Sequence, residues 1–450
     1  MKETVLILMS AAKGHLNPSF GIARLFSQQG YAVVYAAPFQ VHAYIFEQGF
    51  QSVSLEGYPF GINTEDILDY IGKSQRVKYF DNLIDRFYDT VFKFRKAAIE
   101  RIIQQTKPSI IFLDSFQSTD FVVLYPLLKQ RKIKFALIQT MTSFHQQSHS
   151  LPLNCGIIPN PKTNFNWYWN NYYLKRWLKT AWENVAFFGK SSKRIVQQKI
   201  KEQGIDGLYQ SDDEQFKRIG FKNITEFIIC PPAFEFTAQK QPYQYYLGLL
   251  VDLNRKEDTK HPLNLLLEKL PLNQAIIYCS FGTLYADYGK KKDILKFFKI
   301  LLKTVTQFPE RIFVVSLAED FVKMLGVIPQ NIHFFDTVPQ LTALGRSSLF
   351  ITHGGLNSIK ESIALGVPML VYPVDKNWDQ RGNAAKVVYH GLGLKGELQQ
   401  ETTASLENKI KILLNDDSYK KRLSLFKNES PFSDNESLFN FMMTKSTMLS

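Results

Sequence analysis

The sequence contains no uninterrupted apolar run near the roughly 18 residues that a membrane-spanning helix requires. Residues 5–9, after Lys2, could mimic a short signal peptide, but the run is brief and leads straight into Gly14-His15, so we expect a first strand there. Cysteine is also scarce: Cys155, Cys230 and Cys279 lie far apart, and no two have the spacing of metal ligands. We therefore expect small core cysteines and a cytoplasmic protein.

Low-complexity tracts, short repeats and nucleic-acid-binding motifs are absent from the sequence as well. Lys and Arg number 54 against 41 Asp and Glu, which gives a formal net charge of +13. Basic runs such as Lys290-Lys291-Lys292 fall in helical surface patterns that are typical of solvated faces. The charge therefore does not indicate nucleic acid, and it is compatible with an anionic substrate or with peripheral contact to an anionic membrane.

A length of 450 residues with 45% hydrophobic residues is sufficient for two or more domains with full cores. In the N-terminal half, residues 5–9, 31–37, 110–113 and 135–139 are apolar runs typical of buried strands, with helical segments such as 16–28 between them. Strands that alternate with helices predict a parallel doubly wound sheet.

Two residues of this half lie where such a sheet binds ligands. His15 follows the first strand, and Asp114 follows the strand at 110–113, so both belong to the carboxyl edge of the sheet and could meet in space. The carboxylate would then fix the imidazole tautomer and stabilise its positive charge. A surface or capping role is the alternative for a single histidine in a loop.

The C-terminal half repeats the pattern after a polar linker at 237–261, with strands expected at 275–280, 312–317, 332–335 and 369–372. Its densest stretch is an apolar strand at 348–351, a Gly354-Gly355 turn and a helix. The helix is expected to begin at an N-cap, Asn357 or Ser358.

The free N–H groups at that helix N-terminus suit a phosphate, and His353 adds a side-chain donor beside them. Glu361, one turn into the helix, could accept hydrogen bonds from ribose hydroxyls. Asp379-Gln380 follow the next strand at the same edge of the sheet. An ordinary strand–helix–strand unit with a glycine turn fits the spacing alone equally well.

Residues 164–190 hold four of the five tryptophans, Trp167, Trp169, Trp177 and Trp182, interleaved with basic residues. One interpretation is a helix that packs an aromatic face on the N-terminal domain. A second is the wall of an apolar pocket, and a third is an amphipathic helix at a membrane surface whose lysine stems reach past the apolar face. The sequence leaves all three open.

Three motifs together resemble the UDP-dependent glycosyltransferases of the GT-B fold, which include plant and animal small-molecule glycosyltransferases and bacterial macrolide glycosyltransferases. The longest runs from Val338 to Ala384 and contains V-P-Q, T-H-G-G-x-N-S-x-x-E, G-V-P-M and D-Q-x-x-N-A. The others are Gly14-His15-Leu16-Asn17-Pro18 and Ser280-Phe281-Gly282-Thr283. The resemblance implies two Rossmann-like domains that face each other across a cleft. The expected division is an acceptor domain at 1–240, a nucleotide-sugar domain at 241–430 and a helix within 431–450 that crosses back.

The resemblance also implies roles for individual residues. The diphosphate would be bound by His353, Asn357 and Ser358, with help from Ser280 and Thr283. Glu361 would bind the ribose, and the Val338 backbone and Gln340 would contact the base and ribose. Asp379 and Gln380 would bind the sugar. The turn glycines Gly282 and Gly355 complete this donor set. Thr337 stands where the family usually has a tryptophan that stacks on uracil, so the preference for uridine is open.

The implied reaction is transfer of a sugar, expected from Gln380 to be glucose, to a hydroxyl of a small apolar acceptor such as a flavonoid or a macrolide. His15 would be the general base, Asp114 its partner, and Trp167, Trp169 and Phe144 would line the acceptor site. The sequence has no Asp-x-Asp metal motif, which fits an inverting, metal-independent reaction with the UDP-sugar as co-substrate and no cofactor. The alternatives are a lipid or carotenoid glycosyltransferase at a membrane surface, a non-catalytic nucleotide-binding relative and a nucleotide-sugar epimerase.

Overall fold

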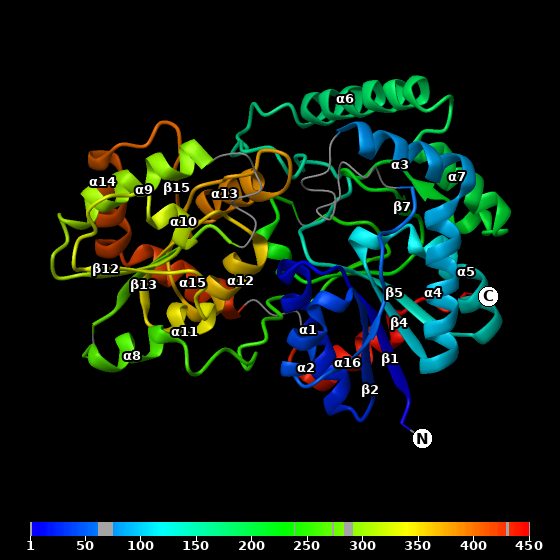
Figure 1. The fold of residues 1–450 in the computed structure, drawn as a ribbon, viewed down its shortest axis with the longest axis horizontal. Helices are drawn as coiled ribbons and strands as arrows, with labels where there is room; N and C mark the ends of the chain where they lie inside the picture. Colours follow the sequence, from blue (N-terminus) through cyan, green and yellow to red (C-terminus); the bar gives the residue numbers. More distant parts are fainter. Residues whose placement is uncertain are drawn as a thin grey trace.

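The computed structural model describes residues 2–61, 75–237, 239–271, 274–282, 291–428 and 432–449. Two parallel β-sheets form the centres of two domains, and helices cover both faces of each sheet (Figure 1). The predicted architecture of two Rossmann-like α/β domains is confirmed.

The first sheet has seven parallel strands in the order β3-β2-β1-β4-β5-β8-β9. Their bounds are β1 (Thr4–Leu8), β2 (Ala32–Ala37), β3 (Gln51–Ser54), β4 (Ile110–Asp114), β5 (Lys134–Gln139), β8 (Glu226–Ile228) and β9 (Gln244–Tyr246). Successive residues of β1 are buried in different cores, with Leu6 and Leu8 on one face and Val5 and Ile7 on the other. Because both faces are covered, the strand is a continuous apolar run.

Helices of the first domain pack in two layers. One face of the sheet is covered by α1 (Lys13–Gln28) and α2 (His42–Glu47), and the other by α4 (Thr90–Thr106), α5 (Asp120–Arg131) and α7 (Ser192–Glu202). This domain also contains α3 (Gln75–Tyr88), the long helix α6 (Phe165–Ala186) and a hairpin of β6 (Ser211–Asp212) and β7 (Gly220–Phe221).

The second sheet has six parallel strands in the order β12-β11-β10-β13-β14-β15. Their bounds are β10 (Ile276–Ser280), β11 (Ile312–Ser316), β12 (Ile332–Phe335), β13 (Ser347–Thr352), β14 (Met369–Val371) and β15 (Gly393–Lys395). One face packs against α9 (Lys291–Val305), α10 (Glu319–Val322) and α14 (Thr403–Asn415). The other packs against α8 (Pro262–Lys269), α11 (Gln340–Gly345), α12 (Leu356–Leu365), α13 (Gln380–Tyr389) and α15 (Ser418–Asn428).

The connection between the domains differs from the predicted boundary at 240. Strand β9 pairs with β8, so the first sheet continues to Tyr246. The strand is short and lies inside the polar stretch that we interpreted as linker, which hid it from a search for apolar runs. Near the C-terminus, α16 (Asn435–Lys445) packs Leu438 and Met442 into the core beneath α1, so the chain ends on the first domain.

No helix within the described residues combines the length and the apolar character needed to cross a membrane.

Candidate functional site

His15 and Asp114 meet at the carboxyl edge of the first sheet. Strands β1 and β4 are neighbours in register, with Leu8 opposite Leu113, so the residues that follow them are adjacent in space. His15 Nδ1 lies 3.0 Å from Asp114 Oδ2. We expected His15 in a loop, but α1 begins at Lys13 and places it in the first helical turn. The side chain of Asp114 is fully buried and that of His15 is 13% exposed.

The buried carboxylate is held from several sides. The backbone N–H of Phe116 donates to Asp114 Oδ1 at 3.0 Å, and that of Ser10 donates to Oδ2 at 3.3 Å. Burial alone would raise the pKa of Asp114, but His15 and these donors outweigh it and hold the pKa below its ordinary value. Burial also acts to lower the pKa of His15, yet the Asp114 carboxylate prevails and the pKa is raised. With Nδ1 donating to the carboxylate, Nε2 presents the lone pair that can accept a proton.

The glycine turn of the second domain connects β13 to α12. Gly354 has φ of +89°, and a Cβ there would lie 2.7 Å from Val371 Cγ1, so glycine is required. The predicted N-cap is wrong. Gly355 caps the helix, and Asn357 is inside the first turn, where its Nδ2 donates to Glu361 Oε1 at 2.7 Å. Asn357 therefore forms a hydrogen bond with a carboxylate one turn away and does not cap the helix N-terminus.

His353 is enclosed by two glycines from different turns. A Cβ on Gly282 or on Gly355 would come within 2.7 Å of its imidazole ring. Burial lowers the pKa of His353 to about 4, although a hydrogen bond with the backbone of Ser280 acts to raise it. The imidazole is therefore neutral near pH 7 and can act as a hydrogen-bond donor beside the α12 N-terminus. Ser280 ends β10 and its Oγ accepts from Gly282 N, while Thr283 lies outside the described residues.

Glu361 is completely buried and already has three partners. Arg255 Nη1 donates to Oε1 at 2.6 Å, as does Asn357, and Gln340 Nε2 donates to Oε2. Gln340 also reaches Ser358 Oγ at 3.2 Å. Arg255 comes from the polar segment between the domains and belongs to no motif, so the sequence analysis missed it. Its position in a polar, charged stretch gave no signal.

The segment around Arg255 ties both domains to this site. Asp252 accepts from Arg24 Nε of α1 at 2.6 Å, and Gln48 exchanges two hydrogen bonds with the backbone of Lys256. Glu257 accepts from the backbone N–H groups of residues 341 and 342 at 2.9 Å, so it caps the start of α11. The segment therefore lies against the part of α11 predicted to meet the base near Val338.

Asp379 and Gln380 stand at the N-terminus of α13. Gln380 Oε1 accepts from the backbone N–H groups of Val374 and Asp375 at 2.9 and 2.8 Å. Burial raises the pKa of Asp379 to about 6, and Asn383, which donates to it at 2.8 Å, acts the other way. Helix α13 also reaches the first domain, because Lys386 donates to Thr142 Oγ1, just after β5, at 2.9 Å. The carboxyl edges of the two sheets therefore face each other at this point.

An aromatic cluster extends from His15 toward α6. The Phe116 ring meets the His15 ring edge-on at 4.3 Å and lies 5.1 Å from Trp378 of the second domain. Phe144 and Trp169 belong to the same cluster and are buried, as is Phe216.

Trp167 is a correction to the predicted acceptor site. It is 56% exposed, and the ring it contacts is that of its neighbour Tyr168. Residues two apart on a helix differ by about 200° in direction, so Trp167 and Trp169 cannot share one face. Trp167 therefore lies on the outer side of α6.

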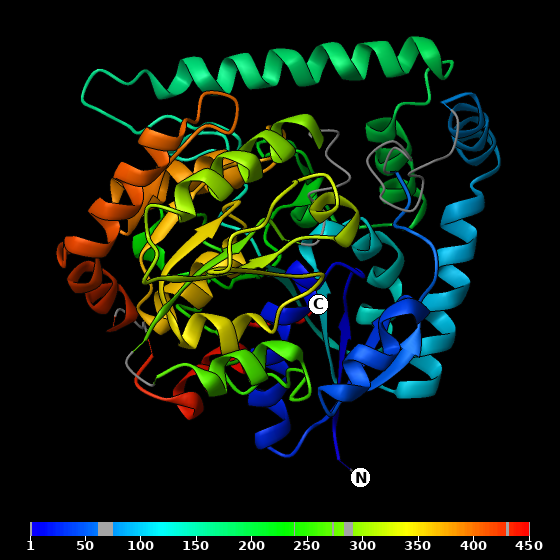
Figure 2. The ribbon, with the colours of Figure 1, turned by 60° about the vertical axis from the view of Figure 1, so that its left-hand side comes forward.

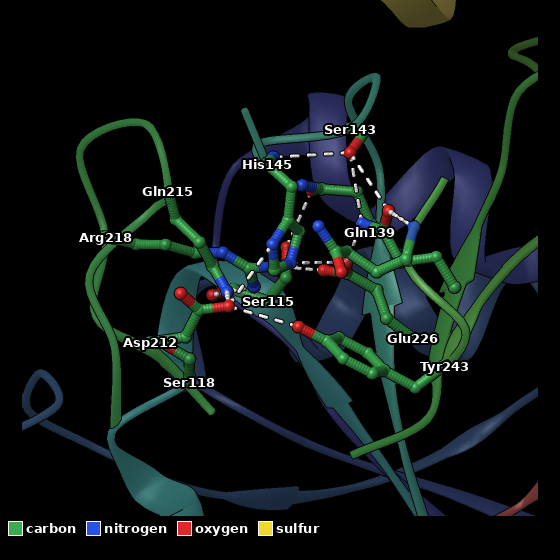
Figure 3. Close-up of polar contacts among 12 residues, drawn as sticks. Ser115, Ser118, Gln139, Ser143, His145, Asp212, Gln215, Arg218, Glu226 and Tyr243 are labelled. Carbon is green, nitrogen blue, oxygen red and sulfur yellow. Dashed lines mark hydrogen bonds and ion pairs between the residues drawn. The ribbon is translucent and has the colours of Figure 1, made fainter. Parts of the chain in front are cut away.

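Buried charged and polar side chains gather around His145 (Figure 3). His145 lies 3.3 Å from Asp212 and 3.8 Å from Glu226, and Glu226 also pairs with Arg218. Although burial acts against it, the pKa of Asp212 is lowered, and His145 is the main cause. Arg218 lies 4.9 Å above the Phe144 ring, and the backbone N–H of Phe216 donates to the Phe144 carbonyl at 2.7 Å, so the network helps to position both rings. Its charged members lie between residues 145 and 226 and form no motif, so the network was not predictable from the sequence.

The chain has relatives of known family. Residues 247–434 match a family model described as UDP-glucoronosyl and UDP-glucosyl transferase. Human UDP-glucuronosyltransferase 3A1 is 41% identical over 92 residues, which cover 20% of this chain and 17% of that protein. An uncharacterized UDP-glucosyltransferase of Bacillus subtilis, YdhE, is 32% identical over 123 residues, 27% of this chain and 28% of the relative. In alignments of this kind the chain spans about a sixth to a third of the curated relatives' lengths.

Similarity to solved structures extends over the whole chain. The glycotransferase of kitacinnamycin has a TM-score of 0.68 and 17% identity, and the alignment covers 99% of both chains. The glycosyltransferase VinC, in complex with DTDP, has a TM-score of 0.62 and 14% identity over 98% of both chains. At these identities the likeness establishes the fold.

Proposed function

We propose that the chain, which matches the UDP-glycosyltransferase family model over residues 247–434 and the glycosyltransferase fold over its whole length, is a member of that family and transfers a sugar from a UDP-sugar to a hydroxyl of a small apolar acceptor. The observation that carries this proposal is the buried His15–Asp114 pair, which lies where Phe116, in contact with the His15 ring, meets Trp378 of the second domain. We propose that a base, a donor-side carboxylate and a helix N-terminus act together there.

His15 is the proposed general base. The acceptor hydroxyl passes its proton to His15 Nε2 while its oxygen attacks the anomeric carbon and the bond to the diphosphate breaks. Asp114 stabilises the imidazolium that forms, and its contacts to Ser10 and Phe116 keep it fixed. A single displacement from the opposite side inverts the anomeric centre.

The diphosphate leaves with increased negative charge, for which the second domain supplies the compensation. Backbone N–H groups at the start of α12 and the neutral imidazole of His353 are the proposed donors. Asn357 and Ser358 lie in the first turn of the same helix and complete the site. These dipoles are fixed by the fold, and we propose that neither a metal ion nor a cofactor is needed beside them.

The sugar is the proposed ligand of Asp379 and Gln380. Because Gln380 Oε1 is occupied by two backbone N–H groups, its amide nitrogen is the atom oriented to donate to a sugar hydroxyl. Asp379 is a carboxylate above pH 6 and accepts from hydroxyls. An equatorial diol such as that of glucose fits one donor and one acceptor side by side.

The nucleoside end of the site has an unusual arrangement. Ribose hydroxyls must share Glu361 with Arg255, and Oε2 is the less occupied oxygen. Thr337 cannot stack on a base as an indole would. We propose that the ribose and diphosphate, more than the base, determine donor affinity.

The test is a transfer screen with UDP-glucose, UDP-N-acetylglucosamine, UDP-glucuronate and TDP-glucose against phenolic, macrolide and terpenoid alcohols, in buffer with a chelator. Wild type and His15→Ala are compared, with His333→Ala, on β12, as the matched histidine control. Transfer that His15→Ala abolishes and the control retains supports the proposal. UDP binding without turnover of any donor would favour a non-catalytic relative, and unchanged activity in His15→Ala would exclude the base.

A further inference from the structure

Helix α6 is aromatic on two opposite faces. Its inner face carries Trp169 in the aromatic cluster and Arg176, which donates to the backbone carbonyls of Asp213 and Gln215 at 3.0 and 2.7 Å. The outer face of α6 consists of six side chains that are each more than half exposed: Trp167, Leu174, Trp177, Leu178, Trp182 and Val185. Leu174, Leu178, Trp182 and Val185 follow one another at three or four residues, Trp167 precedes Leu174 by two turns, and Trp177 flanks them, so the six share one side of the helix.

The stripe continues onto α3. Tyr79 of α3 donates to the carbonyl of Ala186 at 3.0 Å, and Phe87 lies 6.5 Å from Phe188 just beyond the end of α6. The outward side chains of α3 are about half exposed and are Phe80, Ile84 and Phe87. The exposed apolar side chains of the two helices therefore adjoin one another, and contiguous exposed apolar patches mark interaction sites.

The charges beside this surface are mostly positive. Lys175 and Lys179 are exposed on α6 between its tryptophans, and Lys190 lies 4.5 Å above the Phe87 ring. The single acidic residue of α6, Glu183, is buried, where it accepts from Ser192 N. On α3, Asp85 accepts from Thr90 and Val91 of α4, so its charge is used within the protein, and Asp81, half-buried, also has contacts of its own.

The position of α6 suits a flat partner. The helix lies along one outer edge of the molecule with the rest of the chain on its other side (Figure 2). Its 22 residues span about 33 Å. Tryptophan and lysine together on such a face are typical of helices that lie in the headgroup region of a bilayer.

We propose that the outer face of α6, with the adjoining side chains of α3, docks on an anionic lipid surface and that the acceptor is an alcohol dissolved in that membrane. A second copy of the chain is a poorer occupant, because it would bring Lys175 and Lys179 against their own copies in a protein of net charge +13. The proposal that the acceptor is a membrane alcohol rests on the proposed function. Its structural basis is Trp169, which joins α6 to the aromatic cluster that contacts His15.

The docking test is sedimentation with vesicles of phosphatidylcholine alone or with 30% phosphatidylglycerol, together with tryptophan emission. We expect binding and a blue shift with the anionic vesicles only. Trp177→Ser/Leu178→Ser/Trp182→Ser should weaken binding at least tenfold. Phe46→Ser and Leu265→Ser remove equally exposed apolar residues elsewhere and should not.

A charge variant separates the two contributions. Lys175→Glu/Lys179→Glu should lose most binding to anionic vesicles at 50 mM salt, where wild-type binding is strongest. Absence of wild-type binding at millimolar lipid, equal binding to neutral vesicles, or a dimer in sedimentation that the triple variant dissociates would each overturn the proposal.

Activity distinguishes docking from catalysis. The triple variant should keep UDP binding and transfer to a soluble acceptor but lose transfer to an alcohol in vesicles. Vesicle binding by a wild type that transfers nothing would refute the proposed function and leave the docking surface intact. Equal loss of both transfer reactions in the triple variant would refute the acceptor part.

Discussion

Replacement of Asp114 by Asn tests the proposed base most directly, because it changes one atom and removes one charge. Asp114 accepts hydrogen bonds at both oxygens, from Phe116 N at Oδ1 and from His15 and Ser10 N at Oδ2. Whichever way the amide is turned, its NH2 group faces an N–H donor. If the NH2 group takes the Oδ2 position, His15 must turn a lone pair toward it at Nδ1 and carry its proton on Nε2. It then cannot act as a base.

The size of the effect follows from the geometry. A buried ion pair at about 4 Å is worth roughly 4 kcal/mol at an effective dielectric constant of about 20. The imidazolium forms during the reaction, so most of this stabilisation is lost from the transition state. At about 1.4 kcal/mol per factor of ten, we expect kcat to fall by roughly 10³-fold.

The assay is the pH profile of kcat/KM for wild type and Asp114→Asn, with UDP binding and thermal unfolding as checks that the fold is intact. Wild-type activity should rise with pH through the raised pKa of His15, because only the neutral ring accepts a proton. Without the carboxylate, burial dominates and this limb should move to lower pH while the maximum falls. A variant within threefold of wild type, or an unchanged limb, would refute the reasoning.

Three further substitutions test the donor side. Asp379→Asn should raise the unfolding temperature at pH 8, because a carboxyl whose pKa is raised from 3.8 to about 6 costs about 3 kcal/mol when charged. This gain in unfolding temperature should vanish as the pH falls through 6 to below 4, where the carboxyl is protonated. A gain that persists at pH 4 would show that it does not come from the charge of Asp379. Gly355→Ala, whose Cβ would meet the neighbouring imidazole at 2.7 Å, should weaken UDP binding by calorimetry at least tenfold. Gly345→Ala, with open space around it, should not. Arg255→Met should destabilise the protein by roughly 3–5 kcal/mol in urea, because Glu361 is left buried without its cation, and added Glu361→Gln should restore much of the loss.

The sequence predicted the fold well because its strands carry an unambiguous signal. Strands such as β1 and β13 are covered on both faces, so each is an apolar run with clear ends. Strand β9, short and polar in its surroundings, carries no such signal and was taken for linker. The start of α12 was displaced for a related reason, since Asn357 has the side chain of a cap but bonds to Glu361.

His15 and Asp114 could be paired from sequence because strand order makes neighbours of distant residues. Any side chains directly after two adjacent parallel strands share one edge, so the prediction needed only that β1 and β4 be adjacent. Trp167 and Trp169 show the limit of such reasoning. Composition grouped them, whereas helical geometry places one in the cluster and the other outside.

Arg255 marks a stronger limit, since no pattern predicts a partner that arrives from a connecting segment. Its ion pair with Glu361 depends on where that segment runs, and the segment is fixed by Asp252 to α1 and by Glu257 to α11. A change in the relative position of the domains would therefore move the guanidinium against the carboxylate proposed to bind ribose. Donor affinity and domain geometry are coupled through one buried cation, which a motif confined to the second domain cannot encode.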